Sequence, residues 1–437
     1  MTRISSRLKS LSWQPQRAMG AMPAKGPGQG PKRSGTAHLA GRLMWTVAMA
    51  TALCAGAAAA DGDANTHYRL FIGDHAQGIV RAVDLGDGAD AGVFPIDQTP
   101  ALTRSASGRV VYAVQGAAGK VAVIDTGIAF EDHGDHADLE VGAARLLPTV
   151  IAGKTPAHVV EGVGLTALFD DGTGEVMLFP EGDLMGGTLA PVTLAPGAAH
   201  HGLAAPMGDF VVVSVPHETA DQPRVGLRVI DMAGQPVGEV VNCPGVHGQA
   251  QSARVFAFGC RDGIVLATPG TGTAPPTLEH IPTGHLGEGN ISTLKGGRAM
   301  QVFLGNFGPA AVVLIEPGNG TTFRKIDLPT RRVDFALDPV NLRNAYILTE
   351  DGQLHLLDIL SATITQSAQV TEPYSLDGHW RDPRPRLAVA GDHIAITDPL
   401  RGVVRVVSTA TLKEGRTIAV EGVPYTIVAV GGSGADH

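Results

Sequence analysis

The chain has 437 residues, a formal net charge of −9, 57 glycines and an aromatic content of only 5%. This length is ample for a large core, and the acidic balance argues against nucleic acid or an anionic membrane as a partner. No window carries a sustained helical stripe of apolar residues, and short runs of Val, Ile, Leu and Phe alternate with turns rich in Gly, Asp, Asn and Pro. This alternation is typical of strands and hairpins, so the sequence predicts an all-β protein.

Residues 1–60 differ in composition from the rest of the chain. They contain eight Lys or Arg and no Asp or Glu, and an apolar run at 43–50 precedes four alanines at 57–60. A basic region, an apolar region and a small-residue end predict a cleaved secretory signal peptide and a periplasmic protein. The apolar run falls short of the roughly 20 residues of a membrane span, so we expect no stable insertion of the mature chain. Cleavage removes eight of 33 basic residues and none of 42 acidic ones, which shifts the net charge to about −17.

From residue 61 onward the chain repeats one unit, a turn around a proline followed by short apolar strands joined by Gly, Asp or Asn. Examples of the hairpins lie at 109–125, 165–179 and 254–266. The prolines that open the units are 38 to 56 residues apart, a period typical of a β-propeller with several strands per blade. They are Pro100, Pro156, Pro196, Pro244, Pro282, Pro329, Pro373 and Pro424.

Only one strand, at 425–430, follows the last of these prolines. The strands missing from that unit are supplied by the apolar runs at 68–73 and 78–84. A blade built from both ends of the mature chain closes the ring and removes exposed sheet edges. The sequence therefore predicts a single propeller domain over 61–437 with eight blades, or seven if one proline does not open a repeat.

The first repeat is long because it contains an insertion near 128–148, which we expect to be a surface loop. Its polar centre holds Asp132, His133, Asp135 and His136. Two imidazoles three residues apart, interleaved with carboxylates, form a candidate metal site that is open and suited to capture or handover. The alternative is a solvated loop without metal.

Three consecutive repeats carry histidine just after the opening proline: His158, then His200 and His201, then His247. In a propeller, the segment that enters the innermost strand of each blade lies at one mouth of the central channel, so we expect these imidazoles to converge. Three or four nitrogen ligands, with a carboxylate or water, suit tetrahedral Zn²⁺. Glu161 is either a further ligand or a partner that fixes a histidine tautomer.

The mature chain retains two cysteines, Cys243 and Cys260. In an exported protein such a pair most often forms a disulfide, and a separation of 17 residues suits neighbouring strands of one sheet. We therefore predict a structural disulfide, with thiolate metal ligands as the alternative.

Catalytic signatures are sparse in this sequence. It contains no Gly-x-Ser-x-Gly, no His-Glu-x-x-His, no phosphate-cradling loop and no Cys-x-x-Cys-His haem attachment. Asp170 and Asp171 precede a glycine and are interpreted as turn residues. His285 and His379 occupy looser equivalents of the repeat histidines.

Four strings of residues carry a resemblance to a known family: Ala199-His200-His201-Gly202, Cys243-Pro244-Gly245-Val246-His247-Gly248, Phe258-Gly259-Cys260-Arg261-Asp262-Gly263 and Phe169-Asp170-Asp171-Gly172-Thr173-Gly174. Together they resemble the AztD-type periplasmic zinc chaperones, and the likeness covers most of the mature chain. The resemblance implies an eight-bladed propeller that binds Zn²⁺. It also implies, as partner, the solute-binding protein of a zinc ABC importer, to which the zinc is passed.

We therefore predict a non-enzymatic, monomeric periplasmic metallochaperone that binds Zn²⁺ through clustered histidines. Two alternatives remain open. In a metal-dependent hydrolase or lactonase of propeller fold, the metal keeps an open position and activates water, and chelation abolishes turnover. In a metal-free interaction scaffold, the histidines only hydrogen-bond turns, and tight Zn²⁺ binding is absent.

Overall fold

The computed structural model describes residues 65–134, 136–219, 222–318 and 320–434. Within these ranges nearly all regular structure is β-strand, with one α-helix, α1 (Glu181–Met185), and two short 3₁₀ segments, Gly116–Ala118 and Gly284–Leu286. No helix in this part of the chain is long and apolar enough to cross a bilayer. The predicted leader at 1–60 lies outside the described residues.

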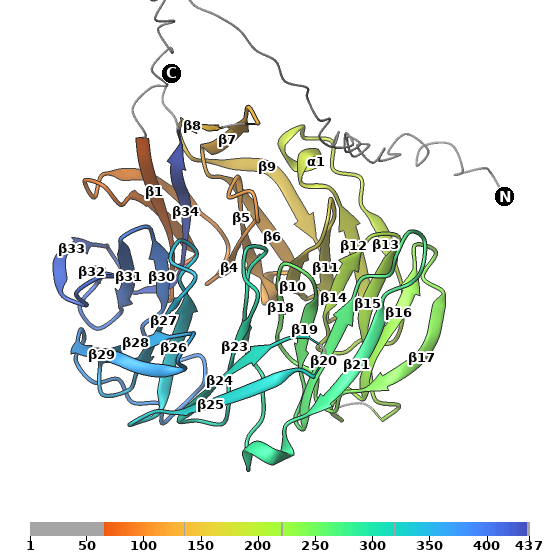
Figure 1. Ribbon diagram of the computed structural model, residues 1–437. Coiled ribbons are helices and arrows are strands. Elements are labelled where there is room, and N and C mark those ends of the chain that lie inside the picture. The colour runs from red at the N-terminus through yellow and green to blue at the C-terminus, as the bar shows by residue number, and fades with distance from the viewer. Residues whose placement is uncertain (1–64, 135, 220–221, 319, 435–437) are drawn as a thin grey trace, which may run out of the picture. The chain divides into compact units, whose positions relative to one another are not determined.

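The described strands form eight antiparallel four-stranded sheets, the blades of a propeller (Figure 1). Blade 1 contains β4 (Ala101–Arg104), β5 (Val110–Gln115), β6 (Lys120–Asp125) and β9 (Arg145–Ala152). Blade 2 contains β10 (Pro156–Glu161), β11 (Thr166–Asp170), β12 (Glu175–Phe179) and β13 (Val192–Leu194). Blade 3 contains β14 (Ala204–Met207), β15 (Phe210–Val215), β16 (Gly226–Asp231) and β17 (Pro236–Asn242). Blade 4 contains β18 (Gln249–Gln251), β19 (Phe256–Gly259), β20 (Gly263–Thr268) and β21 (Thr277–Pro282).

The remaining blades continue in the same way, and the last is shared between the two ends of the described chain. Blade 5 contains β22 (Leu294–Lys295), β23 (Phe303–Asn306), β24 (Ala311–Glu316) and β25 (Thr322–Asp327). Blade 6 contains β26 (Arg332–Leu337), β27 (Asn344–Thr349), β28 (Gln353–Asp358) and β29 (Thr363–Gln369). Blade 7 contains β30 (Leu387–Ala390), β31 (His393–Asp398), β32 (Val403–Ser408) and β33 (Glu414–Ala419). Blade 8 contains β1 (Asn65–Asp74), β2 (Ile79–Asp84), β3 (Asp90–Pro95) and β34 (Pro424–Gly434).

Blade 8 closes the ring as the sequence predicted. Its strand order is β3-β2-β1-β34, so the last strand of the chain lies beside the first and takes the innermost place. The pairing runs along nearly the whole of both strands, with Leu70 opposite Ala429 and Phe71 opposite Val428. This arrangement satisfies the backbone groups of an edge that would otherwise be exposed. The prediction of an all-β propeller with eight blades is confirmed.

The core lies between neighbouring blades. Buried apolar residues of the described chain gather into eight clusters, one at each junction of adjacent blades. At the junction of blades 3 and 4, for example, Val212 and Leu227 pack in the same cluster as Phe258 and Val265. Burying each such side chain contributes about 1.5–3 kcal/mol, so the stacking of blades is the main stabilising contact of the ring.

The expectation of a surface loop at 128–148 is wrong for most of that segment. Residues Ile128–Asp132 (β7) and Ala137–Val141 (β8) pair as a β-hairpin, and the segment then enters β9, the outermost strand of blade 1. The hairpin forms because Ile128 and Leu139 are buried in the cluster between blades 8 and 1. The polar run that suggested a loop occupies the turn of the hairpin and its flanks.

Cys243 and Cys260 form the predicted disulfide, with an S–S distance of 1.99 Å. The bond does not join neighbouring strands of one sheet, as the sequence spacing suggested. Cys243 follows β17 of blade 3, and Cys260 lies between β19 and β20 of blade 4. The disulfide therefore ties the connection between blades 3 and 4 to blade 4.

Candidate metal centre

His158, His201 and His247 lie together where the innermost strands of blades 2, 3 and 4 begin. One ring nitrogen of each histidine lies within 4.8 Å of the corresponding atoms of the other two. The Nε2 atoms of His158 and His201 are 3.4 Å apart, and the three ring centroids are 5.0 to 5.7 Å from one another. Three successive repeats thus bring their imidazoles to one point, and we refer to this group as the three-histidine cluster.

The local backbone explains how each ring reaches the cluster. His158 lies in β10, where the register with β11 shifts between Pro156 and His158. Such a bulge bends the strand and changes the direction of a side chain. His201 and His247 lie in the connections that lead into β14 and β18, the innermost strands of the next two blades. All three residues therefore lie at or just before the start of the innermost strand of their repeat.

His201 is oriented by a carboxylate. Its Nδ1–H donates to Asp171 Oδ2 at 2.6 Å, and the backbone N–H of Gly202 donates to the other oxygen of the same carboxylate at 3.1 Å. Because Nδ1 carries the proton, Nε2 presents its lone pair to the cluster. A carboxylate behind a metal-binding imidazole fixes the ring and makes the nitrogen a better ligand.

His247 is oriented by a backbone carbonyl. Its Nδ1–H donates to the carbonyl oxygen of Ser292 at 2.8 Å, which again leaves Nε2 to face the cluster. The Ser292 backbone is held in turn, because its N–H donates to the side-chain oxygen of the buried Asn306 at 2.9 Å. Gly248 has a φ of +73°, and a Cβ there would lie 2.5 Å from the Ser292 oxygen, so only glycine fits beside this contact.

The surroundings of His158 and His247 favour neutral imidazoles. Burial, together with the charges of His201 and His247, lowers the pKa of His158 to about 4. Burial is also the main cause that lowers the pKa of His247 below its usual range. A neutral imidazole is the form that binds a metal, so protons compete weakly with a metal ion for these two rings near neutral pH.

The donor set fits Zn²⁺. Two nitrogens that each bind a tetrahedral zinc at about 2.1 Å lie about 3.4 Å from each other. The distance between the Nε2 atoms of His158 and His201 matches this value. Three protein ligands leave a fourth position for water or for a group of another molecule.

The structure does not bring His200 and Glu161 into the cluster. His200 donates from Nδ1 to the Ala198 carbonyl at 2.7 Å, and its Nε2 accepts from the Ser214 hydroxyl at 2.8 Å, so both ring nitrogens are engaged. Glu161 accepts from the backbone N–H of Ala106 at 2.6 Å and lies 3.5 Å from the Arg298 guanidinium. His200 and Glu161 therefore stabilise their surroundings in this structure.

The hairpin contains a second group of histidines. His133 and His136 stack with their ring centroids 5.3 Å apart at the turn between β7 and β8. Asp138 lies between them, 3.0 Å from Nε2 of His133 and 3.4 Å from Nε2 of His136. Asp132 accepts the backbone N–H of Gly134 at 2.8 Å. The predicted ligand Asp135 lies outside the described residues.

A cavity of about 420 Å³ borders the three-histidine cluster at His201. Its wall includes His201, His217, Arg224 and Arg261. The Arg224 guanidinium donates to the carbonyl of Val246 at 2.7 Å, which holds the segment that carries His247. A molecule in this cavity would therefore lie directly beside the ring of His201.

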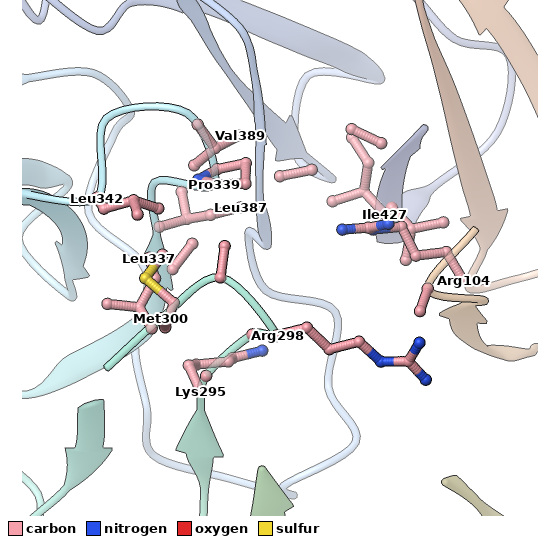
Figure 2. Close-up of a pocket in the computed structure, with 18 residues that line it drawn as sticks. Arg104, Lys295, Arg298, Met300, Leu337, Pro339, Leu342, Leu387, Val389 and Ile427 are labelled. Carbon is pink, nitrogen blue, oxygen red and sulfur yellow. The ribbon is translucent and has the colours of Figure 1, made fainter. Parts of the chain in front are cut away.

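Figure 2 shows a separate cavity of about 440 Å³, which contains none of the predicted ligands. Its lining includes three basic residues, Arg104, Lys295 and Arg298. It also includes apolar residues, among them Met300 and Leu337. Its lining includes residues of β4, β22, β26, β30 and β34, which are innermost strands of blades other than those of the three-histidine cluster.

Sequence reasoning missed two residues of these groups. Asp171, which orients His201, was interpreted as a turn residue. That interpretation holds for Asp170, whose carboxylate accepts backbone N–H groups including those of Thr155 and Gly172. Asp138 was not singled out among the acidic residues of the insertion. The looser equivalents His285 and His379 belong to neither group, since their rings lie beside Phe323 and Trp380 respectively.

Comparison with known proteins identifies close relatives. No profile of a known protein family matches the chain. The sequence is 45% identical over 374 residues to the zinc chaperone AztD of Citrobacter koseri, an alignment that covers 85% of this chain and 88% of that protein. The crystal structure of Citrobacter koseri AztD superposes with a TM-score of 0.83 and 44% identity, covering 85% of this chain and 100% of the other.

Two further structures match the fold. The structure of apo AztD from Citrobacter koseri superposes with a TM-score of 0.80 and 42% identity, covering 85% of this chain and 100% of the other. The dihydro-heme d1 dehydrogenase NirN superposes with a TM-score of 0.56 at 16% identity, over 82% of this chain and 74% of the other. The latter likeness concerns the fold alone.

Proposed function

This chain belongs to the AztD family of zinc chaperones, and from this membership we propose that it binds Zn²⁺ through His158, His201 and His247. We further propose that it hands the ion to the solute-binding protein of a zinc ABC importer. The relative that is 45% identical is named a zinc chaperone and not an enzyme, which agrees with the predicted non-enzymatic role and sets the hydrolase alternative aside.

One observation carries the proposal for the zinc ligands. Three imidazoles from three successive blades converge within ligand distance of one another. Those of His201 and His247 are each held from behind by a hydrogen bond at Nδ1, which leaves Nε2 for the metal. Histidines that only stabilised turns, as in the scaffold alternative, would have no reason to present their lone pairs to one point.

The geometry of the cluster also suits release. In this proposal the fourth zinc position is filled by water until a partner approaches. The cavity beside His201 provides the path along which a ligand of the acceptor would reach the ion. Transfer then proceeds by replacing one histidine at a time with acceptor ligands, so the zinc is never released free into solution.

We propose that the β7–β8 hairpin is a second, weaker zinc site used for capture or handover. His133, His136 and Asp138 already lie within reach of a common ion. Asp132 and Asp135, which the sequence analysis selected, are proposed as further carboxylate ligands because they neighbour these histidines in the sequence. His200 is proposed to support the cluster and not to bind zinc, because both its nitrogens are engaged.

The composition of residues 1–60 supports a periplasmic location after cleavage of the leader. The disulfide Cys243–Cys260 is consistent with this location, because disulfides persist in oxidising compartments. We propose that the mature chain acts as a monomer that meets the solute-binding protein transiently.

Zinc binding is tested by loading the stripped, purified chain and counting bound zinc after gel filtration. We expect a tightly held zinc that is lost in His201→Ala and retained in the matched variant His200→Ala, since the two residues are adjacent in sequence. Equal zinc retention by both variants would contradict the proposed ligand set.

Transfer is tested by mixing zinc-loaded chain with the metal-free solute-binding protein and separating the two by ion exchange. A chelator too weak to remove zinc from either protein is present in excess. We expect zinc to reach the acceptor without appearing on the chelator, because handover is direct. Appearance of the zinc on the chelator first would overturn direct transfer while leaving zinc binding intact.

A further inference from the structure

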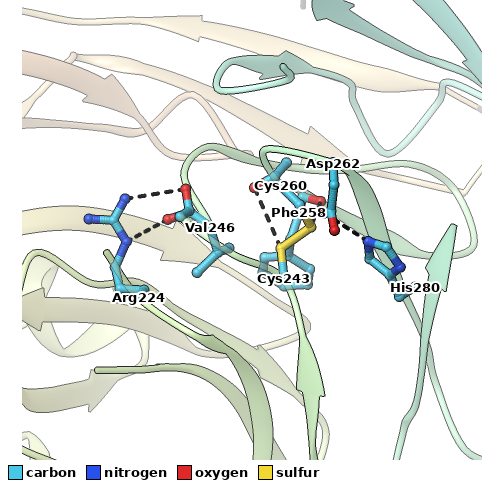
Figure 3. The surroundings of a disulfide bond; sticks show 9 residues. Arg224, Cys243, Val246, Phe258, Cys260, Asp262 and His280 are labelled. Carbon is cyan, nitrogen blue, oxygen red and sulfur yellow. Dashed lines mark hydrogen bonds and ion pairs between the residues drawn. A yellow bond between two sulfur atoms is a disulfide. The ribbon is translucent and has the colours of Figure 1, made fainter. Parts of the chain in front are cut away.

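The disulfide lies against two side chains that commonly bind metals (Figure 3). The Cys260 sulfur, a carboxylate oxygen of Asp262 and a ring nitrogen of His280 all lie within 4.8 Å of one another. His280 Nε2 is 3.1 Å from Asp262 Oδ1, so the imidazole and the carboxylate are already paired beside the sulfur. We refer to these three residues as the sulfur cluster.

The fold fixes the sulfur cluster on the outer part of blade 4. Cys260 and Asp262 lie in the tight turn between β19 and β20, and His280 lies in β21, the outermost strand. The backbone N–H of Thr283 donates to the Asp262 carbonyl at 3.0 Å, which ties the turn to the end of β21. The three side chains are therefore held together by the sheet and not by the disulfide alone.

Exposure differs across the sulfur cluster. Cys260 is 1% exposed, whereas the side chains of His280 and Asp262 are 23% and 48% exposed. The group thus runs from the core to the surface, with its oxygen and nitrogen donors on the solvent side. An ion can approach from that side, although the sulfur itself is covered by protein.

Thiolate, imidazole and carboxylate are the three ligand types that zinc prefers in proteins. A disulfide sulfur lacks the negative charge of a thiolate and is a poor ligand, so the cluster cannot bind zinc while Cys260 is bonded to Cys243. We propose that opening this disulfide creates a zinc site formed by Cys260, Asp262 and His280, with Cys243 as the second thiolate.

The chemistry balances with a dithiol as reductant. The dithiol gives two electrons and two protons to the Cys243–Cys260 bond and becomes a disulfide, which leaves two cysteine thiols. Zinc then binds the two thiolates and displaces two protons into solution. A disulfide oxidant reverses the process, because re-forming the Cys243–Cys260 bond removes both sulfur ligands and expels the zinc.

This site is separate from the three-histidine cluster but shares a segment with it. Cys243 and His247 belong to the same connection between blades 3 and 4, and the N–H of Val246 donates to the Cys243 carbonyl at 3.1 Å. Zinc binding at the sulfur cluster depends on the redox state of the protein, whereas zinc binding at the three-histidine cluster does not. The inference goes beyond the proposed function, since it requires thiolates and no acceptor protein.

Cobalt alone serves as the probe, because a thiolate bound to Co²⁺ gives a charge-transfer absorption that histidine ligands do not produce. The full chain is titrated with Co²⁺ before and after reduction by a phosphine, and free thiols are counted in each sample. We expect no charge-transfer absorption in the oxidised protein. In the reduced protein we expect the absorption to rise until about one cobalt ion per chain is bound at the sulfur cluster. His280→Ala should weaken this binding by at least about tenfold, while the neighbouring, exposed His285→Ala should not change it.

The buried disulfide can resist the reductant, so Cys243→Ala and Cys243→Ser provide the free Cys260 thiol without reduction. Circular dichroism establishes that each variant is folded. A reduced or variant protein that is folded, has a free Cys260 thiol and shows no thiolate–cobalt absorption overturns the proposal. An absorption that is unaffected by His280→Ala also overturns it. Neither result bears on the three histidines, whose cobalt complex lacks this absorption.

Discussion

The three-histidine cluster and the β7–β8 hairpin use the same kinds of side chain in opposite settings. The cluster takes one imidazole from each of three blades, and the orienting bonds come from residues in other parts of the sheet framework, Asp171 and Ser292. The hairpin takes His133, His136 and Asp138 from one turn of a two-stranded ribbon. The first arrangement is held by the packing of the propeller, and the second by a single turn.

This difference suggests how a zinc chaperone can hold zinc tightly at one site and exchange it quickly at another. Ligands that are held in place before the metal arrives lose little conformational freedom on binding, so affinity is high. Ligands on a small hairpin must be ordered by the metal, so affinity is lower and exchange is faster. We therefore propose a division in which the three-histidine cluster stores zinc and the hairpin exchanges it, and each prediction below tests that division.

Removal of a cluster ligand should have the largest effect. A zinc site contributes about 10–16 kcal/mol shared among its ligands, so His201→Ala should weaken zinc binding by roughly 100-fold to 1000-fold. Competition with a chromophoric chelator measures the change. His200→Ala is the control, and a comparable loss in that variant would mean that the storage site is not the one described.

Acid should destabilise the metal-free protein through His158, whose imidazole is held in its neutral form. The pKa of His158 is lowered to about 4, mainly by burial, from an ordinary value of 6.5. The unfolded chain therefore binds this proton more readily, and stability present above pH 6.5 is lost as the pH falls toward 4. The loss amounts to roughly 3 kcal/mol.

Denaturant unfolding at several pH values measures this effect. His158→Gln should flatten the decline, because an amide does not titrate. An unchanged pH profile in His158→Gln would show that burial of this ring does not govern the acid sensitivity.

Loss of the orienting carboxylate should have an intermediate effect. Asp171→Asn keeps the size of the side chain but removes the charge that holds the Nδ1 proton of His201. Zinc affinity should fall about 10-fold to 100-fold. The same titration measures it, with Asp170→Asn as a variant expected to lose stability at its turn while keeping the affinity. The division would lose support if Asp171→Asn bound zinc as tightly as the native chain.

Changes in the hairpin should have the smallest effect on affinity and act on rate. Replacing His133 and His136 together by alanine should leave the affinity of the three-histidine cluster unchanged within about twofold, since neither residue supplies a contact to it. The rate of zinc transfer to the solute-binding protein should fall several-fold, as measured by stopped-flow fluorescence of the acceptor. A large loss of equilibrium affinity would place storage in the hairpin instead.

Much of the fold could be predicted because the same pattern, a proline turn followed by short apolar strands, repeats along the chain. Each anchor proline precedes or begins an innermost strand, and apolar runs behind it become strands buried on both faces, such as Val110–Gln115. The hairpin at 128–141 was mistaken for a loop, because charged residues surround the turn while Ile128 and Leu139 carry the packing. Two buried apolar residues separated by a polar run give little signal in a single sequence.

The candidate site was predictable only in part. Matching positions in successive repeats point to His158, His201 and His247 because a propeller places such positions side by side. The sequence does not separate His200 from His201, since adjacent residues point in different directions and the outcome depends on Ser214 and Asp171. An aspartate before glycine gives the same signal whether it caps a turn or orients a histidine.

The pairing of β1 with β34 brings together residues as far apart as Thr66 and Ser433, which are 367 positions apart in the chain. In the proposed export through a translocon the amino end emerges first, so the inner edge of β1 has no partner until β34 follows. The ring, and with it the proposed zinc site, would therefore be complete only after the whole chain has been exported.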